Sequence, residues 1–203
     1  MENKRINQIY EFGKEINKFK SVYRLSQIGP KERQESDAEH TWHLCMLVWM
    51  FCKEIEAKVD LLKCLKLALV HDLVEIYAGD TWGLTTEDVS AQKQQKELQA
   101  CEFIRQSLPE DIGSEIKDLW LEYEARETEE AKYVWAMDKL HPRIQWLLSE
   151  GDLSDNKPRN SSKAISQEQM ISDVDNTFQL LLETINEEKT TLQLKKNPNS
   201  END

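Results

Sequence analysis

The chain has 203 residues and a formal net charge of −12 at pH 7, with 32% charged and 39% hydrophobic residues. This length suits one domain with a single sizeable core. The acidic balance excludes a general nucleic-acid binder, which needs a basic surface, and argues against attachment to anionic membranes. Six Gly and five Pro are too few for a turn-rich sandwich or barrel, so we expect an all-α fold.

The cysteines and the apolar segments indicate the compartment. Four cysteines stand singly among apolar residues, at positions Cys45, Cys52, Cys64 and Cys101. They form no CxxC pair, which disfavours a zinc ribbon or a thioredoxin-like site. The first residues contain no apolar signal-peptide core, and no stretch approaches the ~20 apolar residues of a membrane span. These features predict a cytoplasmic protein.

Apolar residues recur at helical spacing through most of the chain. The expected helices cover residues 5–19, 38–57, 61–78, 91–107, 111–124, 128–148 and 166–188. Ser36 and Glu39 form a capping-box pattern, Asp60 and Thr128 are suitable N-caps, and Gly79 suits a helix end. Loops or linkers are expected at residues 20–37, 80–90 and 150–165. We expect one helical domain over 1–188 and a polar, disordered tail over 189–203.

Several polar residues occur where the apolar pattern predicts burial. His40 lies early in the 38–57 helix, and the pair His71-Asp72 lies late in the 61–78 helix. Helices joined by a short connection usually pack antiparallel, which brings His40 close to that pair. Asp138 lies in the apolar stretch "YVWAMDKLHP". A buried charge costs several kcal/mol unless it is paired or bound to a metal, so these four residues are candidate ligands.

Two imidazoles and two carboxylates form a mixed nitrogen and oxygen donor set. Such a set suits one divalent ion, and Mn, Co, Fe, Ni, Zn and Mg all remain open. A water on that ion has a lowered pKa. Glu75 follows His71 by one helical turn and is therefore expected to face the site. His43 is open to a supporting or a packing role, and His141, before Pro142, is expected to be structural.

The pattern H…HD…D at positions 40, 71–72 and 138 resembles the HD-domain superfamily of metal-dependent phosphohydrolases. Three longer segments resemble the branch related to bacterial 5′-deoxynucleotidases of the YfbR type. They are "RQESDAEHTWHLCML", "LALVHDLVEIYAGDT" and "YEARETEEAKYVWAMDKLHP". The resemblance implies a single helical bundle of the HD-domain type, a divalent metal ion as cofactor, and a homodimer.

The resemblance also assigns roles to individual residues. It makes His40, His71, Asp72 and Asp138 the metal ligands. It makes Glu75 the carboxylate that orients or deprotonates the attacking water, and Asp80 a second active-site carboxylate. Arg24 corresponds to an arginine that holds the nucleotide phosphate, with Arg33 and Lys139 as weaker candidates. Leu25 stands where those deoxynucleotidases carry a Trp. Trp82 follows Asp80 closely and is a candidate to border the substrate pocket.

The expected function is hydrolysis of a small phosphomonoester, such as a nucleoside 5′-monophosphate, by metal-activated water. Two alternatives stay open. The first is an HD-type phosphodiesterase or a (p)ppGpp-type nucleotide hydrolase, although two-metal phosphodiesterases use more histidines than the four in this chain. The second is a non-catalytic nucleotide or metal sensor, which would not need a water-activating carboxylate at position 75.

Overall fold

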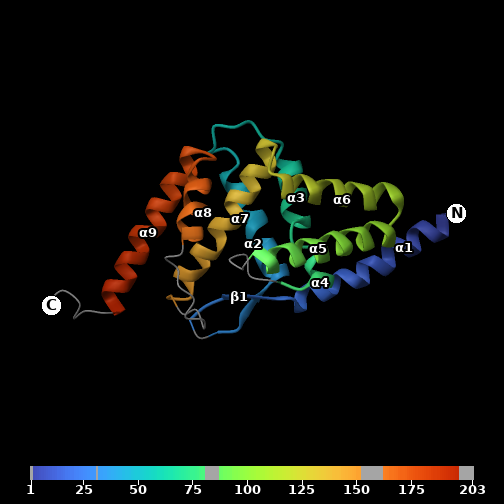
Figure 1. The fold of residues 1–203 in the computed structure, drawn as a ribbon, viewed down its shortest axis with the longest axis horizontal. Helices are drawn as coiled ribbons and strands as arrows, with labels where there is room; N and C mark the ends of the chain where they lie inside the picture. The colour runs from blue at the N-terminus through green and yellow to red at the C-terminus, as the bar shows by residue number, and fades with distance from the viewer. Residues whose placement is uncertain (1, 31, 81–86, 152–161, 197–203) are drawn as a thin grey trace.

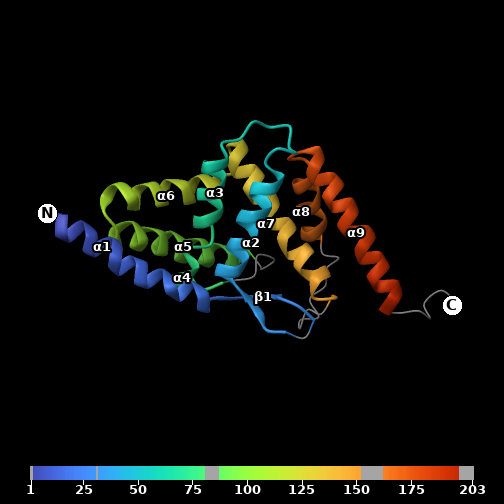
Figure 2. The same ribbon diagram turned by 180° about the vertical axis from the view of Figure 1, so that it is seen from behind.

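The computed structural model describes residues 2–30, 32–80, 87–151 and 162–196. The described part is helical apart from one short hairpin, which confirms the expected all-α class. Three helices, α2, α3 and α7, stand together in the middle of the molecule (Figure 1). Helices α1, α5 and α6 lie on one side of them and α8 and α9 on the other, so the two ends of the chain lie at opposite ends of the molecule (Figures 1 and 2).

The helices and strands have the following bounds. The N-terminal half contains α1 (Glu2–Glu15), the 3-10 helix η1 (Ile16–Ser21), β1 (Tyr23–Gln27), β2 (Gln34–Ser36), α2 (Asp37–Phe51), α3 (Leu61–Val70) and α4 (Glu75–Ala78). The C-terminal half contains α5 (Glu87–Ser107), α6 (Glu110–Ala125), α7 (Glu129–Leu148), α8 (Ser162–Ser172) and α9 (Asn176–Lys196).

The expected helix starts at α2, α3 and α7 are confirmed by their caps. The Ser36 side chain accepts a hydrogen bond from the Glu39 backbone N–H while the Glu39 carboxylate accepts from the Ser36 N–H, which completes the capping box. Asp60 caps α3 and Thr128 caps α7 in the same way, each with a side-chain oxygen that accepts from first-turn N–H groups. These caps fix where the three central helices begin.

The segment 20–37, expected to be a loop, contains an antiparallel hairpin instead. Strand β1 pairs with β2 in a register that matches Tyr23 with Ser36 and Gln27 with Gln34. The buried side chain of Gln145 on α7 donates a hydrogen bond to the Gln27 carbonyl at 2.7 Å. The hairpin is therefore held by tertiary contact with α7, which local sequence preference does not encode.

The expected continuous helix over 61–78 is interrupted directly before the site. Helix α3 ends at Val70, and the following residues form turns with i to i−3 hydrogen bonds, such as Glu75 N–H to the Asp72 carbonyl at 2.9 Å. Tighter bonds of this type change the angle between successive side chains. Gly79 ends the short helix α4 with a positive φ of 76°, as its position predicted.

The C-terminal third differs from expectation in two ways. The single helix expected over 166–188 is two helices, because Asp175 caps the second by accepting from the Thr177 N–H at 2.9 Å. Helix α9 then continues to Lys196, so the helix end expected at 188 is wrong. Lys195 and Lys196 lie in its last turn, where their positive charges interact favourably with the negative end of the helix dipole.

Two apolar clusters flank the central helices. The larger joins α2, α3, α7 and α9 through fully buried residues such as Leu44, Leu67 and Phe178. The smaller joins α1, α5 and α6 to the end of α3 through Phe12, Ile104 and neighbouring residues. Within the described ranges, none of the helices has the length and apolar content to cross a membrane. The polar site lies where α2, the end of α3 and α7 meet.

Candidate metal centre and surrounding site

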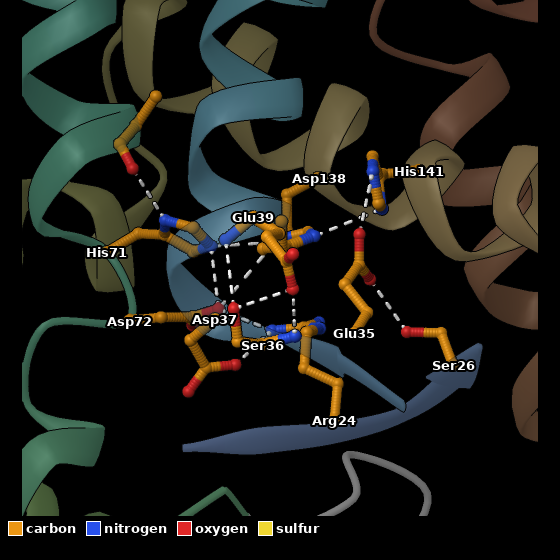
Figure 3. Close-up of polar contacts among 12 residues, drawn as sticks. Arg24, Ser26, Glu35, Ser36, Asp37, Glu39, His71, Asp72, Asp138 and His141 are labelled. Carbon is orange, nitrogen blue, oxygen red and sulfur yellow. Dashed lines mark hydrogen bonds and ion pairs between the residues drawn. The ribbon is translucent and has the colours of Figure 1, made fainter. Parts of the chain in front are cut away.

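The four expected ligands converge on one point, although they come from three separate parts of the chain; Figure 3 labels His71, Asp72 and Asp138 among them. Nε2 of His40 on α2 lies 3.0 Å from Oδ1 of Asp138 on α7. Nε2 of His71, directly after α3, lies 2.9 Å from Oδ2 of Asp72 and 3.6 Å from Oδ1 of Asp138. Nε2 of His40 lies 3.8 Å from the same Asp72 oxygen. We call these four residues the metal cluster.

Groups around the metal cluster hold its members in place. Nδ1 of His71 donates to the Ala68 carbonyl at 2.8 Å, which places the lone pair of the neutral ring on Nε2, facing the cluster. Oδ2 of Asp138 accepts from the Tyr123 hydroxyl at 2.7 Å and from Lys139 Nζ at 2.6 Å. Oδ1 of Asp138 is thereby directed toward the imidazoles. Such outer contacts are typical of metal ligands.

The cluster fits a divalent cation on two grounds. Nε2 of His71 is buried and makes no hydrogen bond of normal geometry within the described residues, although the Asp72 carboxylate is close to it. Burial opposes a positive charge there, yet Asp72 and Asp138 raise the pKa of His71 to about 10. Burial and the charge of Arg24 lower the pKa of His40 to about 4. Asp72 and Asp138 thus stabilise a positive charge at the point where the Nε2 atoms of His40 and His71 meet. A metal ion, bound by these nitrogens in their neutral form, would supply that charge.

Arg24 on β1 lies at the edge of this cluster, beneath it in Figure 3. Its Nη1 donates to Oδ2 of Asp72 at 2.6 Å and to Oδ1 of Asp37 at 3.3 Å. Burial opposes its charge, but the surrounding carboxylates raise the pKa of the guanidinium above its ordinary value. The hairpin that the sequence did not predict therefore brings Arg24 to the site.

A second group, which we call the acid cluster, consists of Asp37, Glu75 and Asp80. One oxygen from each lies within 4.8 Å of one from each of the others. Burial, together with the charges of Asp72, Asp37 and Asp80, raises the pKa of Glu75 to about 11. Burial and the charge of Asp72 raise the pKa of Asp37 to about 6. Glu75 thus clusters with Asp37 and Asp80.

Cationic side chains border the acid cluster. The charges of Arg24, Lys93 and Lys139 each oppose the effect of burial, which still leaves the pKa of Asp80 raised. Lys93 on α5 was not singled out from the sequence, where it belongs to a run of polar residues that resembles an ordinary solvated face. Its pKa is raised against burial by Glu97, Glu75 and Asp72, which places it among the site charges.

The remaining expected substrate residues have different positions. Arg33 is exposed and donates from Nη1 to the Glu39 carboxylate at 2.8 Å, at the start of α2, rather than to the clustered carboxylates. Lys139 contacts the cluster through Asp138. Trp82 lies outside the residues that the structure describes. Two of the three expected phosphate-binding cations therefore contact a member of the metal cluster, Arg24 through Asp72 and Lys139 through Asp138.

The two histidines without an expected site role also reach the site. His141 is fully buried, and its Nδ1 lies 3.0 Å from Nδ1 of His40. Its Nε2 lies 2.9 Å from Nδ1 of His43. His141 follows Asp138 on α7 and His43 follows His40 on α2, each by about one turn, so a shared helix face was the available signal.

An all-α fold with a buried two-histidine, two-aspartate cluster defines a class of metal-binding helical domains. A profile of the HD domain family matches residues 16–179, which include all four residues of the metal cluster. The chain therefore belongs to the HD domain family.

Curated relatives carry the name 5′-deoxynucleotidase. The chain is 34% identical over 128 residues to 5′-deoxynucleotidase HDDC2 of Mus musculus, covering 63% of this chain and 61% of that protein. It is 32% identical over 140 residues to HDDC2 of Xenopus laevis, covering 68% of each chain. It is 38% identical over 141 residues to 5′-deoxynucleotidase hdd1 of Schizosaccharomyces pombe, covering 67% of this chain and 66% of that one. The matches thus span about three fifths to two thirds of these relatives.

Solved structures extend the likeness over nearly the whole chain. A crystal structure from Magnetospirillum magnetotacticum, described as a predicted metal-dependent phosphohydrolase, superposes with a TM-score of 0.82 at 29% identity. It covers 93% of this chain and 94% of that one. A conserved hypothetical protein from Pyrococcus furiosus superposes with a TM-score of 0.61 at 26% identity, covering 91% and 99%. The helical arrangement around the site is therefore shared with these proteins.

Proposed function

We propose that this protein is a metal-dependent phosphohydrolase that cleaves small phosphomonoesters, with nucleoside 5′-monophosphates as its substrate class. The carrying observation is that the buried His40, His71 and Asp138 and the partly buried Asp72 lie together, against both Arg24 and the acid cluster. A metal site, a phosphate-binding cation and a water-handling carboxylate are the three parts that such chemistry requires. The names of the curated relatives and of the Magnetospirillum structure agree with this proposal.

The proposed metal ligands are His40, His71, Asp72 and Asp138. A divalent ion bound by them would lower the pKa of a coordinated water and neutralise charge on the phosphoryl group. Its native identity is left open among Mn, Co, Fe, Ni, Zn and Mg, because this donor set suits all of them.

Three side chains would act on the substrate or on the water. Arg24 uses Nη1 for Asp72 and Asp37, and within the described residues its other N–H groups make no hydrogen bond, so they can reach a phosphate oxygen. Glu75 would accept or direct the proton of the attacking water. Its raised pKa of about 11 implies that cationic charge must be present before it ionises at neutral pH. Asp80 would support Glu75 or contact the sugar.

The sugar preference is a separate matter from the phosphate chemistry. Leu25 follows Arg24 on β1 and is half-buried. An aliphatic side chain makes no hydrogen bond to a ribose hydroxyl, and it offers no flat ring surface against the sugar. We therefore propose that this chain accepts both ribo- and deoxyribonucleoside 5′-monophosphates.

The test is phosphate release from a panel of compounds with Mn²⁺ or Co²⁺ added. The panel pairs each ribonucleoside 5′-monophosphate with its deoxy form and includes a 3′-monophosphate and a cyclic phosphodiester. Release from the 5′-monophosphates that EDTA abolishes is the expected result. Release from the diester alone would point to a phosphodiesterase, and tight nucleotide binding without turnover would point to a sensor.

Two broader properties belong to the same proposal. We infer a homodimer, supported by the exposed Trp42, Trp49 and Met50 on α2, which light scattering of the purified protein tests. A cytoplasmic location is supported by the four cysteines, all of which are free thiols. Fractionation of the native cells tests the location.

A further inference from the structure

The metal cluster is continuous with a row of side chains that the proposed mechanism does not use. From His40 the contacts run to His141, then to His43 on α2 and to Glu35 on β2. Figure 3 shows Glu35 between the His141 ring and the hydroxyl of Ser26. His40, His141 and Glu35 are almost completely buried, and His43 is half-buried. All four histidines of the chain therefore lie in one contiguous group.

The two metal-cluster histidines differ in what holds their second nitrogen. Nδ1 of His71 donates to a backbone carbonyl, that of Ala68. Nδ1 of His40 has a side chain as its partner, Nδ1 of His141 at 3.0 Å. A backbone carbonyl can only accept a hydrogen bond, whereas an imidazole nitrogen can accept or donate. The orientation of His40 therefore depends on which tautomer His141 adopts.

The chemistry of a metal ligand fixes that tautomer. A neutral His40 that binds a cation through Nε2 carries its proton on Nδ1 and must donate it to His141. Nδ1 of His141 then accepts, so the proton of the neutral His141 ring lies on Nε2. That N–H donates to Nδ1 of His43 at 2.9 Å, and the Glu35 carboxylate lies beside it, with Oε1 3.6 Å from His141 Nε2. Each nitrogen in the row has a consistent role.

This order of protons excludes another interpretation of the same residues. Glu35, His43 and His141 each offer an atom within 4.8 Å of the others, which is a spacing that a metal ion could use. A metal there would need the lone pair of His141 Nε2. That nitrogen carries a proton whenever His40 serves as a ligand, so the group is not a second metal site of the loaded protein.

We propose that His141 is a positioning residue of the metal centre: it accepts from His40 Nδ1, donates to His43 beside the Glu35 carboxylate, and thereby fixes the ring and tautomer of that ligand. The inference rests on the proposed metal site. Glu35 is itself held, because its Oε2 accepts from the Ser26 hydroxyl at 2.7 Å. The hairpin and two helices thus contribute to the support of one ligand.

The first experiment measures Co²⁺ affinity by calorimetry for the full chain and its variants. His141→Leu removes the acceptor, and we expect it to weaken Co²⁺ binding by about 10- to 100-fold, as is typical for the outer partners of metal ligands. His141→Gln keeps an amide acceptor for His40 and a donor for His43, and is expected to restore the wild-type affinity. Tyr133→Phe is the matched control. It removes a buried hydrogen bond elsewhere on α7, which the Tyr133 hydroxyl donates to the Val48 carbonyl at 2.7 Å.

The possible results separate the inference from the function on which it rests. Weak binding by His141→Leu alone, with normal binding by the control and by His141→Gln, is expected. Equal affinity of His141→Leu and the wild type would overturn the positioning role and leave the metal site intact. Both proposals would be overturned if the wild type bound no Co²⁺, or if Asp138→Asn bound Co²⁺ as tightly as the wild type.

The second experiment needs no substitution at position 141, so it does not depend on a variant that folds. The ¹⁵N shifts of the histidines are recorded on the Zn²⁺-loaded wild type, where four imidazoles give few signals to assign. His141 is expected to carry its proton on Nε2 and His40 on Nδ1. A His141 ring that is protonated on Nδ1, or a His40 ring with its proton on Nε2, would overturn the inference.

Discussion

The metal cluster and the acid cluster lie side by side, and both contain buried carboxyl groups. The two clusters differ in how the charge of those groups is compensated. In the metal cluster, Asp72 and Asp138 face imidazoles, Arg24 and Lys139, which hold the pKa of both carboxyls well below the ordinary value despite burial. In the acid cluster, burial and the charge of Asp72 raise the pKa of Asp37, Glu75 and Asp80, and nearby cations only partly oppose this effect at Asp37 and Asp80. Burial acts in the same direction in both, so the difference comes from the neighbours.

This difference separates binding from proton handling. Carboxylates that stay ionised can hold a cation at any physiological pH. A carboxyl with a raised pKa holds or releases a proton according to the charge beside it. Arg24 joins the two clusters, because it contacts Asp72 on one side and Asp37 on the other. Substitutions in the two clusters are therefore expected to have distinct effects.

The largest effect is expected at Asp138 in the metal cluster. Asp138→Asn keeps the size of the side chain but removes the charge that His40 and His71 face. Metal content after gel filtration should fall to background, and phosphate release should be lost with it. Far-UV circular dichroism controls for folding. A variant that kept its metal and its rate would remove Asp138 from the ligand set.

The next largest effect is expected from a substitution in the acid cluster, which should lower turnover and leave metal content unchanged. Glu75→Gln keeps the shape of the side chain but cannot take a proton, so kcat should fall by about 10²- to 10⁴-fold. Metal content should stay at the wild-type level, because Glu75 clusters with Asp37 and Asp80. Loss of metal together with activity would show instead that the two clusters act as one binding site.

A smaller effect is expected at Arg24, between the clusters. Arg24→Lys keeps the positive charge but has no planar fork of donors for a phosphate. We expect kcat/KM to fall by about 10- to 100-fold, mainly through KM, since hydrogen bonds to charged groups contribute about 1.5–3 kcal/mol. Steady-state kinetics at saturating metal measure this. An unchanged KM with a lower kcat would place Arg24 in the transition state rather than in substrate binding.

The smallest effect concerns the cap beside His40, outside both clusters. Ser36→Ala removes the side-chain half of the capping box and should cost about 1 kcal/mol of unfolding free energy in urea. Metal affinity should hardly change, which makes it a control for general destabilisation. A large loss of affinity would show that the start of α2 orients His40 directly.

The same cap gives a dependence of stability on pH. Hydrogen bonds from Arg33 and Ser36 lower the pKa of Glu39 to about 2, from an ordinary value of 4.5. Because the folded pKa is the lower one, its stabilisation is complete above the ordinary value and is lost as the pH falls toward about 2. The stability difference between wild type and Glu39→Gln should therefore shrink on acidification. A constant difference would mean that the charge of Glu39 contributes nothing.

The sequence was sufficient for the central helices and for the donor set. Ser36, Asp60 and Thr128 predicted where their helices begin, because a capping side chain acts within a few residues of itself. The convergence of His40 with His71-Asp72 followed from antiparallel packing of adjacent helices. Such features are local, or need only one simple rule of topology.

Other features depended on contacts between distant segments. The hairpin that carries Arg24 is short and polar, and it is held by contacts such as that of Gln145 with Gln27. The turns at 71–74 that interrupt the expected helix contain neither Gly nor Pro, so no strong helix breaker marked them. The split before α9 did have a signal, since Asp175 is a good N-cap. The only signal for His141 was its place one turn after Asp138, and a single buried histidine more often serves packing.

The wide spacing of the ligands along the chain has a consequence for folding. His40 and Asp138 are 98 positions apart in the chain and meet only after α2 and α7 have packed. An unfolded chain has no such site, so any cation that binds there selects the folded state. At a free concentration of 100 times Kd this coupling is worth about 2.7 kcal/mol. The supply of the bound metal would then influence the lifetime of this protein in a cell, as well as its rate of turnover.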